Sequence, residues 1–344
     1  MSHKRIGFAI VGYGLAAKLH AQALARLDEA ELIAMVGRNV EKAKETADSF
    51  GVEALSLDEA LKREDIQAFI VTTPTGSHLE VVREVAPRGK HLLVEKPLES
   101  SLQRTDELIR TCEEAGVILG AVFQHRYDDA SLTLREYQER GLLGKGVMGS
   151  AYVKWYRPQE YYEARSWRGR VEASGGGALA TQASHSIDLL LWFLGEAEKV
   201  CGFMNTLAHT GIEVEDVAVA SIQFKNGALG SVEASTATYP GFPEKLELHF
   251  ERGSAIIQGG KIVYLDTLSD EIPHVGQGES GSSGASDPAA VDIQPFVRML
   301  RDFVNALREG KNPSLDGREG RRAVELIEAA RKSALEGRVI ELPL

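Results

Sequence analysis

The chain of 344 residues is long enough for two domains of ordinary size, and its apolar content of 43% can supply a core for each. Charged residues make up 26%, which argues against a disordered or fibrous class. A formal net charge of −11 argues against nucleic acid as a partner, because binding to phosphates needs basic patches. The two cysteines, Cys112 and Cys201, lie far apart and are predicted to be reduced.

The first apolar run, residues 6–11, is short and leads into glycines, unlike a secretion signal or a membrane segment. We therefore predict a cytoplasmic protein without a membrane partner.

Residues 1–123 alternate short apolar runs with helical patterns. Strands are predicted at residues 6–11, 31–36, 68–73, 91–95 and 117–123, with helices from about residue 16 and after residue 39. Because parallel strands need crossover connections, this alternation predicts a parallel sheet covered on both faces.

Residues 124–344 follow a different pattern, which predicts a second domain. Strands follow one another at residues 216–224, 231–236 and 246–250, and Asn226-Gly227 predicts a hairpin between the first two. Alternation in the third strand predicts an antiparallel sheet with one wetter face. Residues 276–287 have the composition of a mobile loop. A following amphipathic helix carries the apolar stripe Phe296, Val297, Leu300, Phe303, Val304 and Leu307.

A glycine motif follows the first predicted strand. Gly12, Gly14 and Ala17 form the pattern G-x-G-x-x-A at the start of a helix. The first glycine permits a tight turn, the second lets a pyrophosphate approach the backbone, and the small third residue lets helix and strand pack closely. The motif predicts a dinucleotide site at the helix N-terminus. A glycine turn without a ligand is the alternative.

The end of the second strand decides which dinucleotide binds. An acid there accepts hydrogen bonds from the ribose of NAD, but this chain has Gly37, Arg38 and Asn39. No carboxylate repels a 2′-phosphate here, and the Arg38 guanidinium can bind one. NADP is therefore the first choice and NAD the second. The alternative makes Arg38 a solvated turn residue.

Two loops follow later strands of the parallel sheet. Residues 72–78 read TTPTGSH and residues 95–97 read EKP. Ligands bind at the carboxyl ends of such strands, so Lys96 is predicted to point toward the nicotinamide. Partial burial there would lower its pKa and suit it to proton transfer. Read alone, the triplet would be an exposed turn.

The segments GYGLAAKLH, TPTGSH and EKP, in this order and spacing, resemble the glucose-fructose oxidoreductase/inositol dehydrogenase/MocA (Gfo/Idh/MocA) family. The resemblance spans nearly the whole chain. It implies an α/β fold with an N-terminal Rossmann domain and a C-terminal α/β domain that has a large, mainly antiparallel sheet. It also implies that Lys96 is the active-site lysine, that the bond before Pro97 is cis, and that the chain forms a homodimer or homotetramer.

The family's second catalytic residue is a histidine, usually in a D-x-x-x-H run after a glycine-rich loop. His185 matches this histidine, but Thr181 stands where the acid is expected. The resemblance thus implies a catalytic His185 that lacks that carboxylate, and a role for Gln182 in binding substrate or cofactor. Without the resemblance, His185 would be read as a packed histidine at a helix start.

Residues 157–170 combine four arginines with Tyr161, Tyr162 and Trp167. Aromatic rings and guanidinium groups suit a sugar that carries an anionic group. The segment looks similar to the nucleotide-sugar branch of the family, which includes the UDP-N-acetylglucosamine-uronate 3-dehydrogenases and generally uses NAD. An ordinary interface or solvated loop is the alternative.

We therefore predict an NAD(P)-dependent enzyme that moves a hydride between nicotinamide and a ring carbon of a sugar, nucleotide sugar or polyol. Lys96 would hydrogen-bond the reacting oxygen and His185 would exchange its proton. The alternatives are a non-catalytic NAD(P)-binding sensor and a glycosidase that uses bound NAD in a transient oxidation. No metal site is expected; the acidic pair at 128 and 129 is read as solvated, and His20 as a packing residue.

The assigned cofactor contacts are Gly12, Tyr13, Gly14, Leu15, Ala16, Ala17, Arg38, Thr73, Pro74, His78, Glu95, Lys96 and Gln124. The assigned substrate contacts are Arg126, Tyr162, Trp167, Arg168, Gln182 and His185.

Overall fold

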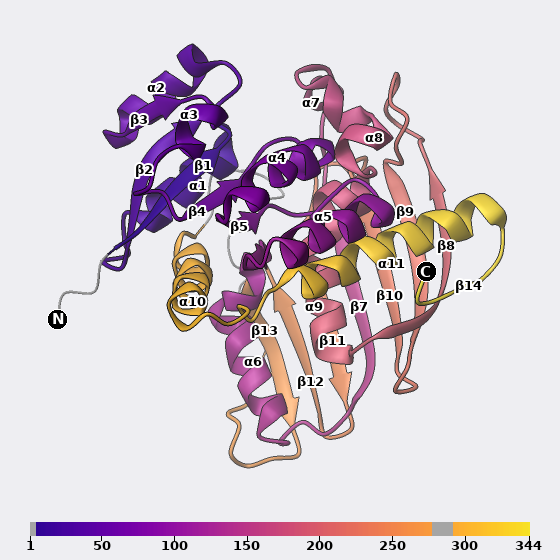
Figure 1. The fold of residues 1–344 in the computed structure, drawn as a ribbon. Coiled ribbons are helices and arrows are strands. Elements are labelled where there is room, and N and C mark those ends of the chain that lie inside the picture. Colours follow the sequence, from indigo (N-terminus) through magenta and orange to yellow (C-terminus); the bar gives the residue numbers. More distant parts are fainter. Residues whose placement is uncertain (1–4, 277–291) are drawn as a thin grey trace. The chain divides into compact units, whose positions relative to one another are not determined.

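The computed structural model describes residues 5–276 and 292–344, so the loop predicted at 276–287 lies outside the described residues except at its first position. The chain divides into two units by the packing of its backbone (Figure 1). The first contains Met1–Gln124 and Asp292–Arg321, and the second contains His125–Val291 and Arg322–Leu344. The predicted first domain, residues 1–123, falls inside the first unit, which also takes a segment from much later in the chain.

In the described part of the first unit, six parallel strands form one sheet in the order β3-β2-β1-β4-β5-β6. They are β1 (Ile6–Val11), β2 (Ala30–Val36), β3 (Glu53–Leu55), β4 (Ala68–Val71), β5 (His91–Val94) and β6 (Leu119–Ala121). The strand order reverses between β1 and β4, and ligands bind at such a switch point beyond the carboxyl ends of the strands. The parallel sheet expected from the alternation is confirmed; the short edge strand β3 was not predicted.

Helices connect these strands, and polar caps set where several of them begin. They are α1 (Leu15–Leu24), α2 (Val40–Phe50), α3 (Leu57–Leu61), η1 (Thr75–Ser77), α4 (His78–Val85), η2 (Ala86–Arg88) and α5 (Leu102–Glu114). The side chain of Asn39 accepts from the Lys42 N–H at 3.0 Å, and Ser101 caps α5 in the same way.

Helix α10 (Gln294–Glu309) carries the predicted apolar stripe and packs within the first unit, beside α1 (Figure 1). The ring of Phe303 lies 6.3 Å from that of Phe8 in β1, and Phe296 lies 5.2 Å from the His20 ring in α1. After α10, the Leu315 carbonyl accepts from the Ala121 N–H at 2.9 Å, along the outer edge of β6. The core of the Rossmann unit is therefore completed by a late part of the chain.

In the described part of the second unit, eight strands form a sheet in the order β13-β12-β11-β7-β10-β9-β8-β14. They are β7 (Gly146–Lys154), β8 (Ala197–Asn205), β9 (Val217–Phe224), β10 (Leu229–Ser235), β11 (Lys245–Phe250), β12 (Gly253–Gln258), β13 (Lys261–Thr267) and β14 (Ile340–Glu341). Neighbouring strands pair antiparallel except β7 with β10, which are parallel. The hairpin predicted at Asn226-Gly227 joins β9 to β10, with Gly227 at a φ of +89°.

One face of this sheet is covered and the other is more open. Helix α9 (Ser184–Leu194) packs so closely on β7 that a Cβ at Gly149 would lie 2.8 Å from Leu190. Residues of β11 alternate as predicted, with Leu246, Leu248 and Phe250 buried and the residues between them half-buried, and residues of β9 alternate between buried and exposed. The helical segments are η3 (Gln124–Tyr127), α6 (Asp129–Glu139), α7 (Glu160–Glu163), η4 (Ser166–Gly169), α8 (Val171–Ser174), η5 (Ala178–Ala183), α9 (Ser184–Leu194) and α11 (Gly317–Glu336), of which η3 and α11 begin in residues of the first unit. No helix in the described residues is long and apolar enough to span a membrane. The predicted α/β class, a parallel Rossmann sheet and a mainly antiparallel second sheet, is confirmed.

Candidate active site

The glycine loop between β1 and α1 has the shape that a pyrophosphate requires. Gly12 has a φ of +123°, and a Cβ at this position would meet Thr72 Oγ1 at 2.3 Å. Gly14 begins α1 with extended backbone and no side-chain cap, so an anion can meet the first N–H groups of the helix. Ala17 is fully buried, whereas Tyr13 and Leu15 are exposed. These residues fit a dinucleotide.

The end of β2 presents an exposed arginine. Within the described residues, Arg38 makes no hydrogen bond or ion pair. A Cβ at Gly37 would lie 3.0 Å from the Tyr13 ring and 3.1 Å from the Ala43 side chain, so an acid at position 37 would have to displace that ring. Arg38 is therefore the side chain at this position that can meet a ribose 2′-phosphate.

Lys96 follows the carboxyl end of β5, and its bond to Pro97 is cis, as the resemblance implied. Burial lowers the pKa of Lys96, while the neighbouring Glu95 acts in the opposite direction. A lysine whose pKa is lowered exchanges a proton more readily near neutral pH. The environment of this side chain thus suits a role in proton handling.

A buried histidine holds the carboxylate next to Lys96. His20 Nε2 lies 3.0 Å from Glu95 Oε1, and Glu95 Oε2 accepts from the Lys96 backbone N–H at 3.1 Å. Burial acts to raise the pKa of Glu95, but the bond to His20 and the interactions with Lys96 together keep it below its usual value. Both carboxylate oxygens have protein partners that fix the backbone at Lys96. His20 packs on Phe296, as expected, and this bond gives it a second role.

His78 ties together the two loops at this edge of the sheet. Its Nε2 lies 2.9 Å from the Thr73 carbonyl and its Nδ1 lies 3.1 Å from the Leu98 carbonyl. The side chain is almost fully buried. This placement favours a structural role for His78 over the cofactor contact that the sequence predicted. Pro74 lies between Thr73 and the short helix η1, at the start of the same loop.

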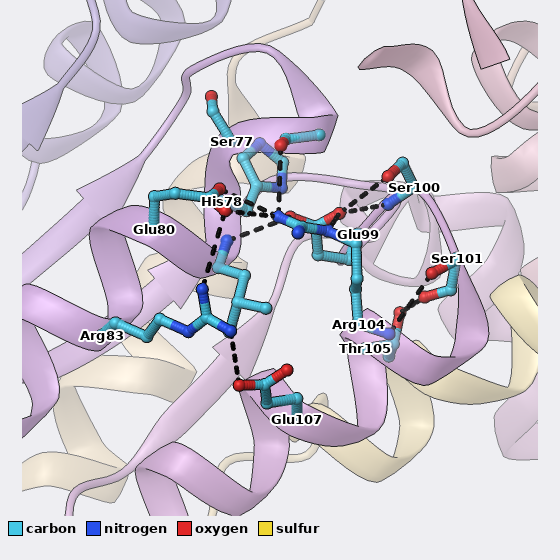
Figure 2. Close-up of polar contacts among 12 residues, drawn as sticks. Ser77, His78, Glu80, Arg83, Glu99, Ser100, Ser101, Arg104, Thr105 and Glu107 are labelled. Carbon is cyan, nitrogen blue, oxygen red and sulfur yellow. Dashed lines mark hydrogen bonds and ion pairs between the residues drawn. The ribbon is translucent and has the colours of Figure 1, made fainter. Parts of the chain in front are cut away.

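A charged network fixes the segment after Lys96. Glu99 has a fully buried side chain, and Arg104 donates to its two oxygens at 2.9 and 3.0 Å. Figure 2 shows Arg104 between Glu99 and Glu80, which it reaches at 2.8 Å. Burial acts to raise the pKa of Glu99, but the Arg104 bonds together with the backbone N–H groups of Ser100 and Leu79 keep it below its usual value. The network joins α4 and α5 to the loop that carries Lys96.

In the second unit, His185 is half-buried in the first turn of α9, directly after the π-helical segment η5. Glu215 supports the preceding glycine loop by accepting from the N–H groups of Gly177 at 2.9 Å and Leu179 at 3.0 Å. A Cβ at Gly177 would overlap the Glu215 carbonyl, so this position requires glycine. Burial raises the pKa of Glu215. Glu215, which lies just before β9 in the chain, thus holds the loop before His185 in place.

Two arginines flank Tyr161 near Gln182. The guanidinium carbon of Arg168 lies 3.9 Å from the centre of the Tyr161 ring, and that of Arg157 lies 5.6 Å from it. Gln182 joins the group, because its amide nitrogen donates to the Tyr161 hydroxyl at 3.0 Å and its oxygen accepts from Arg157 at 3.2 Å. Burial lowers the pKa of both Arg157 and Arg168. In the described residues, Arg168 has no carboxylate partner.

The buried pair His209 and Asp216 holds the backbone of Arg157. His209 Nε2 lies 2.8 Å from the Arg157 carbonyl, and His209 Nδ1 lies 2.9 Å from Asp216 Oδ2. Asp216 is fully buried and also accepts from three backbone N–H groups, those of Leu207, Ala208 and His209. The arginine cluster is therefore built on a fixed support.

Other predicted substrate residues are placed differently. Arg126 is buried and bonds Asp188 at 2.6 and 2.8 Å, and Tyr162 is buried with its hydroxyl 2.8 Å from Thr236 Oγ1. Burial raises the pKa of Tyr162 to about 12. These placements favour supporting roles for both. Trp167 is half-buried beside Arg168. Of the remaining predicted cofactor residues, Ala16 is half-buried in the first turn of α1 and Gln124 is buried at the start of η3.

Sequence reasoning missed the supporting acids and one histidine. These are Glu99, Glu215 and His209, and for the two glutamates an acid beside apolar residues was the available signal. The acidic pair was predicted to be solvated; Asp129 is exposed, but the prediction is wrong for Asp128, whose side chain is 12% exposed and bonds His125. No cluster of three or more potential metal ligands occurs within the ranges that the structure describes.

Two domain families match this chain. Residues 6–123 match an oxidoreductase family with an NAD-binding Rossmann fold, and residues 131–256 match the Gfo/Idh/MocA C-terminal domain. The chain belongs to the Gfo/Idh/MocA family. The resemblance drawn from its motifs is confirmed, and the protein is an oxidoreductase with an NAD-binding Rossmann domain.

Members of the Gfo/Idh/MocA family match along almost their whole length. Myo-inositol 2-dehydrogenase of Thermotoga maritima is 27% identical over 98% of both chains. The NADP-dependent scyllo-inositol 2-dehydrogenase of Bacillus subtilis is also 27% identical, over 98% of this chain and 96% of that one. The WlbA dehydrogenase of Bordetella pertussis, solved with NADH and UDP-GlcNAcA, is 32% identical with a TM-score of 0.86, over 99% of this chain and 100% of that one. Both nicotinamide cofactors thus occur among relatives.

Proposed function

We propose that this oxidoreductase transfers a hydride between a nicotinamide cofactor and a ring carbon of an anionic sugar, such as a uronate or a nucleotide sugar. One observation carries this proposal: Arg168 is a half-buried guanidinium that has no acidic partner among the described residues, and it lies against Tyr161 in a cluster with Arg157. A cation withdrawn from water is stabilised when an anion binds beside it. The similarity to WlbA, whose solved structure holds UDP-GlcNAcA, supports the same substrate class.

The chemistry requires a group that takes a proton. When a hydride leaves a carbinol carbon, the hydroxyl proton must leave too, because the product is a carbonyl compound. We assign the hydrogen bond to the reacting oxygen to Lys96 and the uptake of the proton to His185. The bound nicotinamide would supply the hydride acceptor or donor. Glu95, held by His20, keeps the Lys96 backbone in position for its role.

For the cofactor, we propose that NADPH binds at least as tightly as NADH. The support is local: Arg38 is exposed at the end of β2, where the sequence has no acid that would repel a 2′-phosphate. Fluorescence titration with both reduced cofactors is the test. A parent protein that clearly favours NADH, the cofactor present in the WlbA structure, would overturn this assignment.

The substrate class is tested by steady-state rates with UDP-GlcNAcA, glucuronate and myo-inositol. We expect kcat/KM to be higher for an anionic sugar by roughly one to two decades, the value of one charge-assisted pair of hydrogen bonds. A higher kcat/KM with myo-inositol than with either anion would contradict the proposal. Tight cofactor binding without turnover on any sugar would favour the sensor. Release of aglycone from chromogenic glycosides without NADH accumulation would favour the glycosidase.

Two further expectations stay predictions from the sequence: a cytoplasmic location, and assembly as a homodimer or homotetramer. Size-exclusion chromatography with light scattering would measure the assembly state directly.

A further inference from the structure

The position that holds an acid in the family motif is occupied here by a threonine with local partners. Thr181 Oγ1 donates to the Gly177 carbonyl at 2.7 Å and accepts from the Gln182 side-chain amide at 3.1 Å. These bonds lie within η5 and the glycine loop before it. The acid that usually accompanies the family histidine is therefore not supplied from this position.

A second histidine lies directly against His185. The ring centres of His125 and His185 are 4.7 Å apart, and the two rings are nearly perpendicular, at 87°. His125 Nδ1 lies 2.7 Å from Asp128 Oδ2. Because the carboxylate can only accept, Nδ1 of His125 carries the hydrogen. His185 thus has a carboxylate next to it, one imidazole ring removed.

The Asp128 carboxylate does not cap the helix that it begins, α6. Asp128 is the N-cap residue of α6, a position where aspartate ordinarily accepts from the first backbone N–H groups of the helix. Here its side chain makes no such cap and bonds His125 instead. Its side chain is only 12% exposed, so its charge is weakly screened by water.

A second carboxylate, that of Asp188 in α9, is already paired with a cation. Asp188 lies one turn after His185, and both of its oxygens accept from Arg126. Asp188 and Arg126 form a buried ion pair whose charges largely cancel at a neighbouring site. Of the two carboxylates, it is Asp128 that is linked to His185, through the ring of His125.

From this geometry we propose that His125 and Asp128 are positioning residues for His185 and replace the missing acid of the D-x-x-x-H motif. The inference rests on the proposed function, in which the hydride leaves for nicotinamide and the hydroxyl proton moves to His185. The positive charge that then forms on the His185 ring lies beside His125, and the Asp128 carboxylate offsets it. The His125 ring also fixes the orientation of His185 by packing edge-on against it.

Asp128→Asn is the first test, because it removes the charge and retains the shape. We expect kcat to fall roughly tenfold or more, with KM for the sugar, Kd for the cofactor and Tm near their parent values. Asp129→Asn is the matched control, since the exposed Asp129 loses the same charge at the next position. An Asp128→Asn variant that keeps the parent kcat would overturn the proposal.

His125→Ala tests the ring itself through chemical rescue. We expect kcat to fall and added imidazole to restore part of it, whereas imidazole should not restore Asp128→Asn. A loss in His125→Ala that imidazole does not relieve would assign the pair a purely structural role and would count against the proposal.

A measurement without substrate separates this inference from the proposed function. Nitrogen chemical shifts of 15N-labelled histidine in the full chain report which ring nitrogen carries hydrogen. We expect hydrogen on Nδ1 of His125 in the parent, and His185 signals that change in Asp128→Asn and not in Asp129→Asn. His185 signals unaffected by Asp128→Asn would refute the pairing, even if no sugar in the panel were oxidised.

Discussion

Glu99 in the first unit and Arg168 in the second are two charges withdrawn from water that the protein treats in opposite ways. In the first unit, the fully buried Glu99 is matched by Arg104, and Glu95 is hydrogen-bonded to His20. In the second unit, Arg168 is withdrawn from water without an acid among the described residues. A charge that the protein neutralises itself contributes to a defined fold, whereas one left without a counter-charge is stabilised by a ligand. The comparison predicts which residues hold the structure together and which bind a ligand.

Changing Lys96, in the first unit, has the largest expected effect. We expect Lys96→Met to lower kcat by about 10²- to 10⁴-fold, the range for loss of a positioned acid or base. Cofactor affinity should change little, because the glycine loop supplies the phosphate contacts. Stopped-flow absorbance and fluorescence titration measure the two quantities. Lys62→Met, on an exposed lysine paired with Asp58, is the control; a Lys96 variant that turns over at its rate would remove Lys96 from the chemistry.

Lys96→Met also tests how the free energy of unfolding depends on pH. The pKa of Lys96 in the folded protein is below its ordinary value of 10.5, so the folded state binds fewer protons between those two values. The free energy of unfolding contributed by this group therefore rises with pH through that window, and below the window the cost of burying the charged lysine is fully present. Urea unfolding at neutral and alkaline pH should show this slope in the parent and its loss in Lys96→Met. A steeper slope in the variant would contradict the assignment.

Arg104→Met sharpens the comparison from the side of stability. It leaves the buried Glu99 without its main partner, and breaking such a pair reduces the free energy of unfolding by about 3 kcal/mol. The pKa of Glu99 is lowered, so this contribution is present above its ordinary value of 4.5 and is lost as pH falls through the folded-state pKa. Urea unfolding checks both points. Arg110→Met, on a side chain that is 62% exposed, should change stability by less than about 0.5 kcal/mol.

Arg168→Met is the matched change in the second unit and should have the opposite character. We expect Tm to stay the same or rise, because a partly buried cation is removed. kcat/KM for an anionic sugar should fall by roughly one to two decades, with little change for a neutral polyol. Arg170→Met, an exposed arginine paired with Glu213, is the control. Equal losses for anionic and neutral sugars would make Arg168 a structural residue and break the comparison.

The smallest expected effect is at Arg38. Arg38→Ala should raise the Kd for NADPH by about tenfold, the scale of one hydrogen bond between charged groups, and leave that for NADH nearly unchanged. Arg26→Ala, on another exposed arginine of the first unit, controls for general loss of charge. Parallel changes in both affinities would show that Arg38 does not read the 2′-phosphate.

Local patterns predicted most of the fold. Apolar runs located β1 and β2 within a residue, and the helical stripe located α10. The parallel pairing of β7 with β10 and the place of α10 in the first unit could not be predicted in this way, because both depend on contacts between segments far apart in sequence. Hydrophobic periodicity and secondary-structure propensity indicate which face of a helix or strand is apolar. They do not indicate which segment of the chain packs against that face.

The candidate site, too, could be predicted only in part from local patterns. Gly12 and Lys96 lie in motifs whose order and spacing carry information, so both could be assigned from the sequence. Arg126 and His78 have the right residue types at suggestive positions, yet the structure uses their polar atoms internally. The contact of His125 with His185 joins residues sixty positions apart, which no local pattern contains.

The late segment that completes the first unit has a consequence for biosynthesis. Phe303 packs on Phe8, and residue 315 covers the outer edge of β6, so a nascent chain that ends near residue 124 lacks both. The ribosome must release about two hundred more residues before the Rossmann core can close. Until then an apolar surface and an open strand edge are available to chaperones or to other nascent chains. A fragment ending near residue 124 should therefore aggregate on expression, and co-expression of residues 292–321 would be the natural attempt to rescue it.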